Sequence, residues 1–528
     1  GKAAVKPDAP LYVTSLLSTL TTTPSYAVRR GAAFGLAGLV KGLGISSLKQ
    51  HGVMDRLKCA VEGKAKGEQT SNAREGALHA FELLCEVLGR LFEPYIITIL
   101  PLLLQCVADG SGGVRYAAVA ASQRIMSQLT AQGVRMVLPA LLHALAEDKW
   151  RSVHASVELL GAMAYCAPKQ LSSTLPQVVP ALTEVLTHSH PRVKDSANAA
   201  LASVGAVIKN PEIAAIVPTL LHALSEPSSH TQDALDALAK TQFEHYVDTP
   251  SLALIVPVLH RGLRDKASSA KRKTSHITGN MCSLLSERRD IVPYLPLLLP
   301  ELQAVLHDPI PEVRSTGAKA LGRLCAGLGE EHFPALLPWL FASLEREGSA
   351  VERAGAAQGL AEILSALGDA KVAEMLPVII KGCESASVGG REGFSMLWTH
   401  LPAVLGRRLE PFVKEILPVV LSGLGDEAAP VRECCFRGAH AIIREYLEVA
   451  SRLLLPPLQS GLAADNYRIR QSSAELLGTL VRRLTDGEHL EVVELDEAPR
   501  GARWSTPVRL LVHDGGGDRT GQIFLDHR

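Results

Sequence analysis

The densest group of chemically active side chains in this 528-residue chain is a run of basic residues. It lies within 261–273, where Asp265 is the one acid, and comprises Arg261, Arg264, Lys266, Lys271, Arg272 and Lys273. Such a run predicts a surface that contacts RNA phosphates or an acidic protein. No aromatic residue is interleaved with it, so we expect contacts to backbone phosphates without base stacking. A solvated face without a binding role is the alternative that the sequence leaves open.

The histidines and cysteines do not form a recognisable reactive site. His188 and His190 flank a predicted turn without a carboxylate or thiol at ligand spacing, which favours a solvated turn over a metal site. Arg432 could activate the thiol of Cys434 or Cys435, but packing at a helix start is the preferred interpretation. Phosphate-binding loops and hydrolase motifs are absent. We predict no catalytic residue, no metal, no cofactor and no small-molecule substrate, so the chain is not expected to be an enzyme.

A repeat of about forty residues must position these side chains. Proline, always preceded by Leu or Val, recurs at intervals of 38 to 43 residues at Pro101, Pro139, Pro180, Pro218, Pro257, Pro300, Pro338, Pro377, Pro418 and Pro456. A second marker follows each proline by 12 to 15 residues, at Arg115, Arg151, Lys194, Gln232, Arg272, Arg314, Arg353, Arg391, Arg432 and Arg470. Arg29 and Arg74 extend this second marker toward the N-terminus. Two residue types that stay in phase over ten units indicate an internal repeat.

Each unit has the pattern of two amphipathic helices. In one unit, apolar residues recur at helical spacing over 295–306 and again over 313–328, and an Asp-Pro-Ile-Pro turn at 308–311 separates them. Two helices in a period near forty are typical of HEAT repeats, whose helix pairs stack to bury one continuous core. We therefore predict an all-α fold, an α-solenoid of HEAT repeats with about twelve helix pairs over residues 10–482. Small residues such as Gly322 and Gly478 would allow close helix approach.

The composition supports this architecture and limits the function. Hydrophobic residues make up 47% of the chain but aromatic residues only 4%, which favours helices over a β-sandwich or barrel. The net charge is zero, so any attraction to nucleic acid must be local. Scattered single cysteines predict a reducing compartment, and no apolar run predicts a membrane span.

Two segments interrupt the repeat. Residues 62–76 are polar and predict a long loop. Residues 483–528 are acidic and then rich in glycine, which predicts a disordered tail with a short strand at 508–512.

The repeated basic marker has two interpretations. A residue that recurs in every unit usually serves the repeat, so we favour hydrogen bonds to turn carbonyls or to an acid such as Asp308 or Asp426. The alternative is a ridge of cations along one edge of the solenoid that contacts RNA phosphates.

Several stretches resemble a known family. They include RRGAAFGLAGLVKGLG at 29–44, SVELLGAMAYCAPKQLSSTLP at 156–176, PEVRSTGAKALG at 311–322 and YRIRQSSAELLG at 467–478. These stretches resemble the central segment of the general control non-derepressible translational activators, which is similar to the HEAT region of elongation factor 3. The ungapped stretch at 156–176 is the most specific of them, and the tail beyond 485 lies outside the resemblance.

The resemblance implies a non-catalytic scaffold in translational control. It implies that the chain binds ribosomes in the cytosol and that the full protein activates the initiation factor 2 alpha kinase during amino-acid starvation. Kinase contact is expected through a region outside this chain, and a protein with ATP cassettes is a further expected partner, whereas no membrane partner is expected. The alternative is another HEAT adaptor, namely a nuclear transport receptor, a phosphatase scaffold or a tubulin-binding array.

Overall fold

The structure is a computed structural model that describes residues 8–63, 68–166, 168–486, 490–494, 506–514 and 517–525. Within these residues the helices follow one another as twelve pairs, with the short helix α4 between the first two pairs. The chain divides into two compact units. The predicted all-α fold of HEAT-type helix pairs is confirmed, and the extension of one solenoid over 10–482 stays a prediction.

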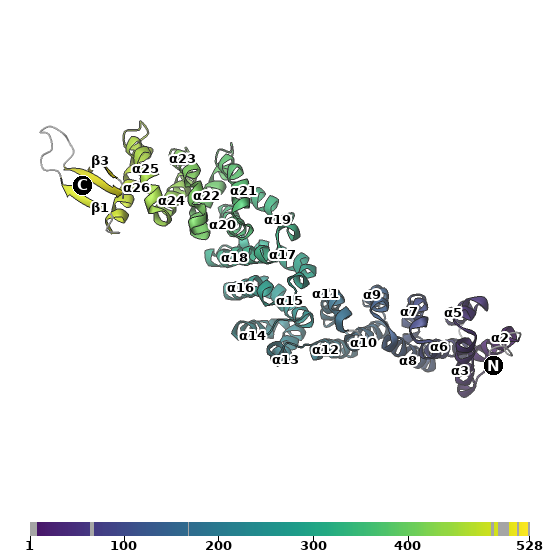
Figure 1. Cartoon of the computed structure of the whole chain (residues 1–528). Coiled ribbons are helices and arrows are strands. Elements are labelled where there is room, and N and C mark those ends of the chain that lie inside the picture. The colour runs from purple at the N-terminus through teal and green to yellow at the C-terminus, as the bar shows by residue number, and fades with distance from the viewer. Residues whose placement is uncertain are drawn as a thin grey trace. The chain divides into compact units, whose positions relative to one another are not determined.

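The first unit comprises Gly1–Gly262 with Leu284–Tyr294. Its helices are α2 (Ala9–Thr22), α3 (Tyr26–Leu43), α4 (Ser46–Gln50), α5 (Val53–Glu62), α6 (Glu68–Leu88), η1 (Gly89–Phe92), α7 (Glu93–Val107), α8 (Gly112–Gln128), α9 (Ala131–Ala144), α10 (Trp150–Cys166), α11 (Pro168–Val185), α12 (Pro191–Ala206), α13 (Pro211–Ser225), α14 (Pro227–Lys240), α15 (Thr249–Leu263) and η2 (Arg288–Tyr294). Here α6, α8, α10 and α12 form one layer, and α7, α9 and α11 form the other (Figure 1).

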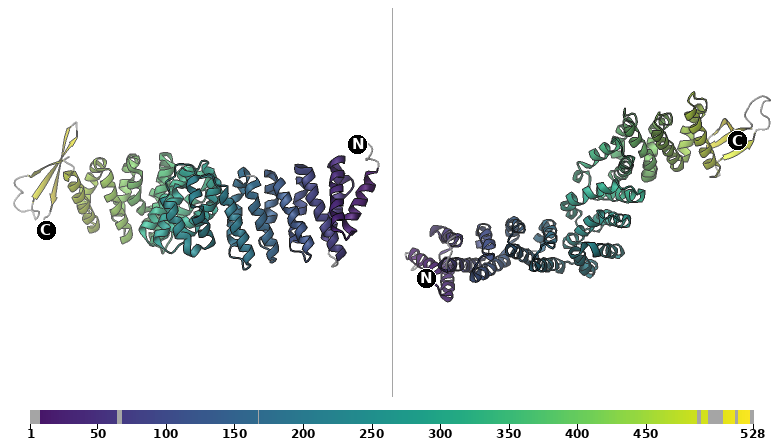
Figure 2. Two further views of the ribbon diagram at one scale, coloured as in Figure 1. Left: turned by 90° about the horizontal axis from the view of Figure 1, so that it is seen from below. Right: turned by 180° about the vertical axis from the view of Figure 1, so that it is seen from behind.

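The second unit comprises Leu263–Ser283 with Leu295–Arg528. Its helices are α16 (Ser268–Leu284), α17 (Leu295–Leu306), α18 (Pro311–Leu328), η3 (Glu330–His332), α19 (Leu336–Leu344), α20 (Ala350–Leu367), α21 (Asp369–Gly382), α22 (Val388–Leu405), η4 (Gly406–Phe412), α23 (Val413–Gly423), α24 (Ala429–Glu445), α25 (Leu447–Leu462) and α26 (Tyr467–Asp486). The second helix of each pair packs on the next, so α18, α20, α22 and α24 form a row (Figures 1 and 2).

The pair α17–α18 shows how the sequence produces the unit. Pro300 lies inside α17, where it removes one backbone hydrogen bond, while Leu298 and Leu302 point into the core with no exposed surface. Pro311 starts α18, because its fixed φ suits the first helical position. Gly329, at φ +89°, ends α18 in a conformation that a side chain would disfavour. Each pair is therefore an apolar two-helix hairpin that needs its neighbours to cover it.

Glycine permits close packing between some of these helices. A Cβ on Gly322 would lie 3.0 Å from the carbonyl oxygen of Glu362 in α20, and one on Gly279 would lie 2.7 Å from the Cα of Ala320. The predicted role of Gly322 is thus confirmed. The same prediction for Gly478 is wrong for the described part of the chain, where no neighbouring atom lies within 4 Å of the position of its Cβ.

The structure describes parts of both predicted interruptions. The loop expected over 62–76 is wrong in extent, because α6 already begins at Glu68 and includes the Arg74 marker. Within the predicted tail, the structure describes the end of α26 at Asp486 and three antiparallel strands, β1 (Leu490–Glu494), β2 (Thr506–Asp514) and β3 (Gly517–Leu525), in the order β1-β2-β3. The rest of 483–528 lies outside the described residues, and its disorder stays a prediction. The strand expected at 508–512 lies within β2, which contains Val508 and the apolar run Leu510, Leu511 and Val512.

One helical stretch passes a length and hydropathy test for a membrane span. It runs over Thr70–Val107 and contains an 18-residue window of mean hydropathy 1.6. Gly89, at φ +55°, and η1 divide this stretch into α6 and α7. The first of these packs against α3 and α8, and the second against α8 and α9. Core helices of a repeat array therefore account for its apolar composition.

Candidate nucleic-acid interface

The repeated arginine is a structural clamp on the turn between the two helices of a unit. Arg314 is the fourth residue of α18, and its Nη1 donates to the carbonyl oxygens of Asp308 at 2.8 Å and Pro309 at 3.0 Å. The same pair of bonds, to the carbonyls five and six residues earlier, is made by Arg29, Arg115, Arg391, Arg432 and Arg470. These carbonyls close the first helix and its turn, where intrahelical partners are lacking. The structural interpretation of the marker is confirmed for these six residues.

The clamp also joins neighbouring units through acids. Nε of Arg391 lies 2.7 Å from Oδ2 of Asp426 in the next turn, and Nζ of Lys271 lies 2.6 Å from Oδ2 of Asp308. Burial acts to raise the pKa of both aspartates, but the hydrogen bonds from these cations and from backbone N–H groups outweigh it, so both pKa values are lowered. Lys271 is also the fourth residue of α16. The marker in this unit is therefore Lys271, and its assignment to Arg272 is wrong by one residue.

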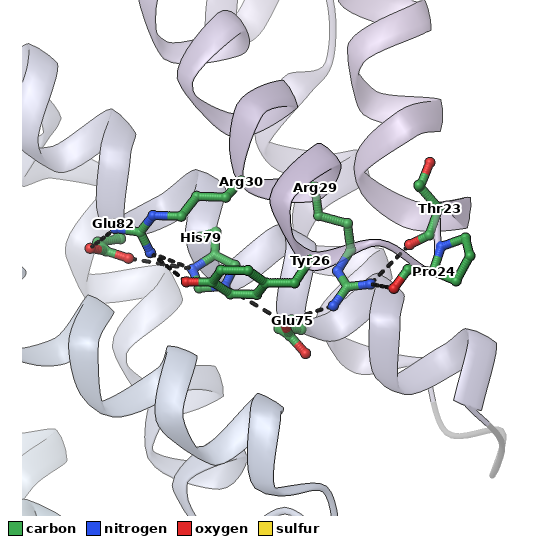
Figure 3. Close-up of polar contacts among 8 residues, drawn as sticks. All are labelled: Thr23, Pro24, Tyr26, Arg29, Arg30, Glu75, His79 and Glu82. Carbon is green, nitrogen blue, oxygen red and sulfur yellow. Dashed lines mark hydrogen bonds and ion pairs between the residues drawn. The ribbon is translucent and has the colours of Figure 1, made fainter.

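Near the N-terminus the same contact forms part of a buried polar cluster (Figure 3). Arg29 on α3 donates from Nη2 to Oε1 of Glu75 on α6 at 2.8 Å, and Arg30 lies 3.3 Å from Glu82. His79, which is fully buried, lies between the two glutamates, and burial lowers the pKa of its imidazole. The cations and carboxylates in this cluster are thus paired with one another and connect α3 to α6.

The structure separates the six basic residues of 261–273 by their roles. Arg261 belongs to the first unit, where its Nη1 donates to the carbonyl of Ala223 at 2.9 Å and burial lowers its pKa. The other five belong to the second unit, and of these Lys271 is paired with Asp308 as described above and Lys273 is half-buried.

Three of the six basic residues in the run are exposed to solvent. Arg264 exposes 62% of its side chain and has Nε 3.7 Å from Oε1 of Glu301, while Lys266 and Arg272 are exposed. A phosphate contact made by this run would therefore depend on Arg264, Lys266 and Arg272, and that contact stays a prediction.

The other basic markers depart from this pair of bonds: Arg74 donates to the carbonyl of Gly63 and Arg353 to that of Arg346, Lys271 pairs with Asp308, and Arg151 and Lys194 are exposed. Arg151 is the second residue of α10, and its Cζ lies over the ring of Trp150, 4.7 Å from the centroid. Lys194 is the fourth residue of α12 but is exposed. Their neighbour His190 stacks on Trp150 with ring centroids 3.8 Å apart, a contact that sequence reasoning missed. The available signal was a tryptophan beside an arginine with a histidine one repeat length further along the chain.

The remaining reactive groups have structural surroundings. Cys434 and Cys435 are buried, and burial raises the pKa of their thiols to about 12 and about 11, which confirms that they pack in a helix. Nδ1 of His188 accepts a hydrogen bond from the backbone N–H of His190 at 3.0 Å within the predicted turn. Among the residues that the structure describes, no three His, Cys, Asp or Glu side chains are grouped to hold a metal ion.

Comparison with known proteins agrees with the fold and with the resemblance seen in the sequence. The chain is 48% identical over 480 residues to the mouse (Mus musculus) protein named "Stalled ribosome sensor GCN1", covering 90% of this chain and 18% of that protein. It is 47% identical over 523 residues to "Protein ILITYHIA" of Arabidopsis thaliana, covering 98% and 19%. It is 42% identical over 466 residues to "eIF-2-alpha kinase activator GCN1" of Saccharomyces cerevisiae, covering 88% and 17%. The predicted resemblance to the general control activators is confirmed, and the chain spans less than a fifth of each of these relatives.

Family models give the same assignment. The model "Elongation factor 3/GNC1 HEAT repeat" matches residues 229–335. The model "EF3 N-terminal HEAT repeat" matches residues 29–201 and 353–487, which together exceed half of the sequence. The chain therefore belongs to the EF3 N-terminal HEAT repeat family.

Proposed function

We propose that this chain is a non-catalytic HEAT-repeat scaffold that binds ribosomes and regulates the initiation factor 2 alpha kinase in the amino-acid starvation response. The observation that carries the proposal is the 48% identity over 480 residues to a protein named as a stalled ribosome sensor. A second relative, 42% identical, is named as an activator of the kinase. From the first name we infer that this chain works beside ribosomes, and the cytosol is the compartment that this proposal assigns to it.

The architecture is consistent with a scaffold. Paired helices expose the starts of their second helices at successive turns, so one edge of each unit can present side chains to a large partner. The clamp arginines stabilise these turns from within, which leaves other turn residues available for contact. Kinase contact and a partner with ATP cassettes extend the proposal and rest on the resemblance alone.

Ribosome binding is tested by cosedimentation of the chain with purified ribosomes through sucrose at low and moderate salt. We expect the chain to sediment with ribosomes and to be released as salt rises, because phosphate contacts are salt-dependent. Failure to sediment at low salt, with helical circular dichroism intact, contradicts direct ribosome binding.

The basic run within 261–273 can be tested in the same assay with its exposed members. The double variant Lys266→Glu with Arg272→Glu avoids Arg261 and Lys271, whose hydrogen bonds stabilise the fold. The control is Arg437→Glu, since this side chain is 57% exposed and pairs only with nearby Glu433 among the contacts described. If the run contacts the ribosome, the double variant should sediment less than the control; equal sedimentation assigns the run to a solvated face.

A further inference from the structure

We propose that the starts of α10 and α12 form a binding surface for single-stranded RNA, which combines a flat stacking platform with exposed cations. We call it the Trp150 edge, and it consists of Lys149, Trp150, Arg151, His190, Arg192 and Lys194. All six residues belong to the first unit, and α10 packs directly against α12. The choice of RNA among polyanions rests on the proposed ribosome contact, whereas the surface itself follows from the geometry.

The platform is a stack of planar groups. The rings of Trp150 and His190 are nearly parallel, with an interplanar angle of 9° and centroids 3.8 Å apart. His154 meets Trp150 edge-on at 6.2 Å. Because His190 occupies one face of the indole, the Arg151 guanidinium, 4.7 Å from the centroid, must cover the other face. The outer side of this exposed guanidinium is a plane on which a nucleobase can stack.

The cations around the platform are available for contact. Lys149, Arg151, Arg192 and Lys194 are exposed, and none of them takes part in an ion pair within the part of the chain that the structure describes. By contrast, Arg115 at the start of the preceding second helix has its Nη1 committed to two turn carbonyls. The cations of the Trp150 edge are therefore available to a ligand, whereas the clamp arginine of a standard unit is hydrogen-bonded to its own turn.

A row of aromatic residues extends the same edge. Tyr116, in the first turns of α8, is 68% exposed, and α8 packs against α10. Each second helix follows a first helix of its own pair, and α8, α10 and α12 pack on one another in order, so their starts lie along one edge of the unit. Tyr116, Trp150 and His190 thus mark three successive units. Because both faces of Trp150 are covered, the planes left for bases on this edge are the guanidinium of Arg151 and the ring of Tyr116, and planar groups beside exposed cations can bind single strands without base-specific hydrogen bonds.

The local charge indicates which interaction matters most. Asp148 and Asp195 are exposed on the same two segments, so the net positive charge of the edge is small. A purely electrostatic phosphate site would lack such acids. Stacking must therefore contribute a large share of the affinity, and removal of either acid should strengthen binding.

The test is fluorescence anisotropy of the 528-residue chain with a labelled 12-nucleotide oligouridylate over a range of salt. Arg151→Glu with Arg192→Glu should weaken binding at least tenfold at low salt, because it removes the stacking plane and a phosphate contact. The salt slope should fall by about 0.7, since each phosphate contact on a single strand contributes that much and Arg192 is the phosphate contact of the two. Asp148→Asn with Asp195→Asn should strengthen binding, which a merely structural role would not produce. Trp150→Phe should retain most of the affinity that Trp150→Leu loses.

The controls separate this surface from general electrostatics. Arg437→Glu with Arg444→Glu reverses two exposed cations of the second unit and should leave binding unchanged. An abasic strand of equal length should bind at least tenfold more weakly than oligouridylate. The proposal is overturned if the abasic strand binds as tightly as oligouridylate. It is also overturned if Arg151→Glu with Arg192→Glu leaves the affinity unchanged, or if the control variant loses as much affinity.

Ribosome cosedimentation distinguishes this inference from the proposed function. If the chain sediments with ribosomes but does not bind oligouridylate, the RNA surface is refuted and the proposed function stands. If sedimentation then also depends on Arg151 and Arg192, the edge contacts an acidic protein instead of RNA. If the chain binds oligouridylate through the edge but does not sediment, the inference stands and direct ribosome binding is refuted.

Discussion

Substitution of Gly355 by alanine should destabilise the second unit, although alanine is the better helix former. Gly355 lies two residues after the Arg353 marker in α20, and a Cβ there would lie 1.7 Å from the carbonyl oxygen of Leu306 at the end of α17. Carbon atoms do not approach oxygen so closely, so backbone must shift by about an ångström or more. We expect a cost near the upper end of overpacking, about 3 kcal/mol, which the helix propensity of alanine offsets by ~1 kcal/mol.

The matched control is Gly31→Ala in α3. Gly31 stands at the same place, two residues after the Arg29 marker, but among the residues that the structure describes no neighbouring atom lies within 4 Å of the position of its Cβ. Only the helix-propensity gain of ~1 kcal/mol remains there, so this substitution should stabilise α3. The same chemical change is thus expected to act with opposite sign in the two units.

Hydrogen exchange measured by mass spectrometry is the suitable assay, because a repeat array does not unfold as one two-state body. A net loss of about 2 kcal/mol should speed exchange of α20 amides about thirtyfold, whereas Gly31→Ala should slow exchange in α3. The reasoning is refuted if α20 exchange is unchanged in Gly355→Ala, or if Gly31→Ala destabilises α3 to a similar degree.

Three further predictions follow from the polar contacts. Arg314→Ala should destabilise the α17–α18 pair by about 2 kcal/mol, because two turn carbonyls lose a charged donor; local hydrogen exchange measures this, and an unchanged rate contradicts the clamp. Glu392→Gln should cost about 3 kcal/mol in thermal unfolding, since it leaves the buried Arg353 guanidinium without the charge of its partner at 2.6 Å. Glu352→Gln, in a more exposed pair, should cost less than ~1 kcal/mol, and equal losses contradict this ranking. The pKa of Asp308 is lowered in the folded chain, so the stability that its ion pair contributes is present above the ordinary pKa near 3.8 and is lost as the pH falls through the folded-state pKa. The melting temperatures of Asp308→Asn and the unchanged chain should therefore differ at pH 7 and converge near pH 2. A difference that stays constant with pH refutes the assignment.

The repeat architecture was predictable because its signals are periodic. Pro300 and its equivalents, the helical spacing of apolar residues and the basic marker each recur in many units, so an error in one unit does not obscure the pattern. The clamp was also predictable in kind, because a residue repeated at a turn is most economically explained by that turn. The register in α16 was ambiguous, since Lys271 and Arg272 are adjacent and both fit the spacing of 14 or 15 residues from Pro257.

The roles of individual charges could not be predicted, because they depend on partners about one repeat away. Arg261 contacts Ala223, and Lys271 contacts Asp308, at separations of 38 and 37 residues. Both residues look like free cations when 261–273 is considered alone. The same limit explains why the stack of Trp150 on His190 was missed, since its two rings are brought together only by the packing of α10 on α12.

These observations suggest where binding residues arise in a repeat protein. A basic residue at the fourth position of a second helix is usually committed to its turn, as Arg314 shows, and its removal would damage the fold before it affected a partner. A marker without these hydrogen bonds, such as Arg151 in α10 or Lys194 in α12, can be substituted without that loss of stability. Contact with a partner should therefore concentrate in units that depart from the repeat, and among the departures seen here the Trp150 edge also provides a stacking surface. Charge reversal at Arg115, a clamp residue, should by this argument reduce stability, whereas charge reversal at Arg192 should reduce RNA binding with stability unchanged.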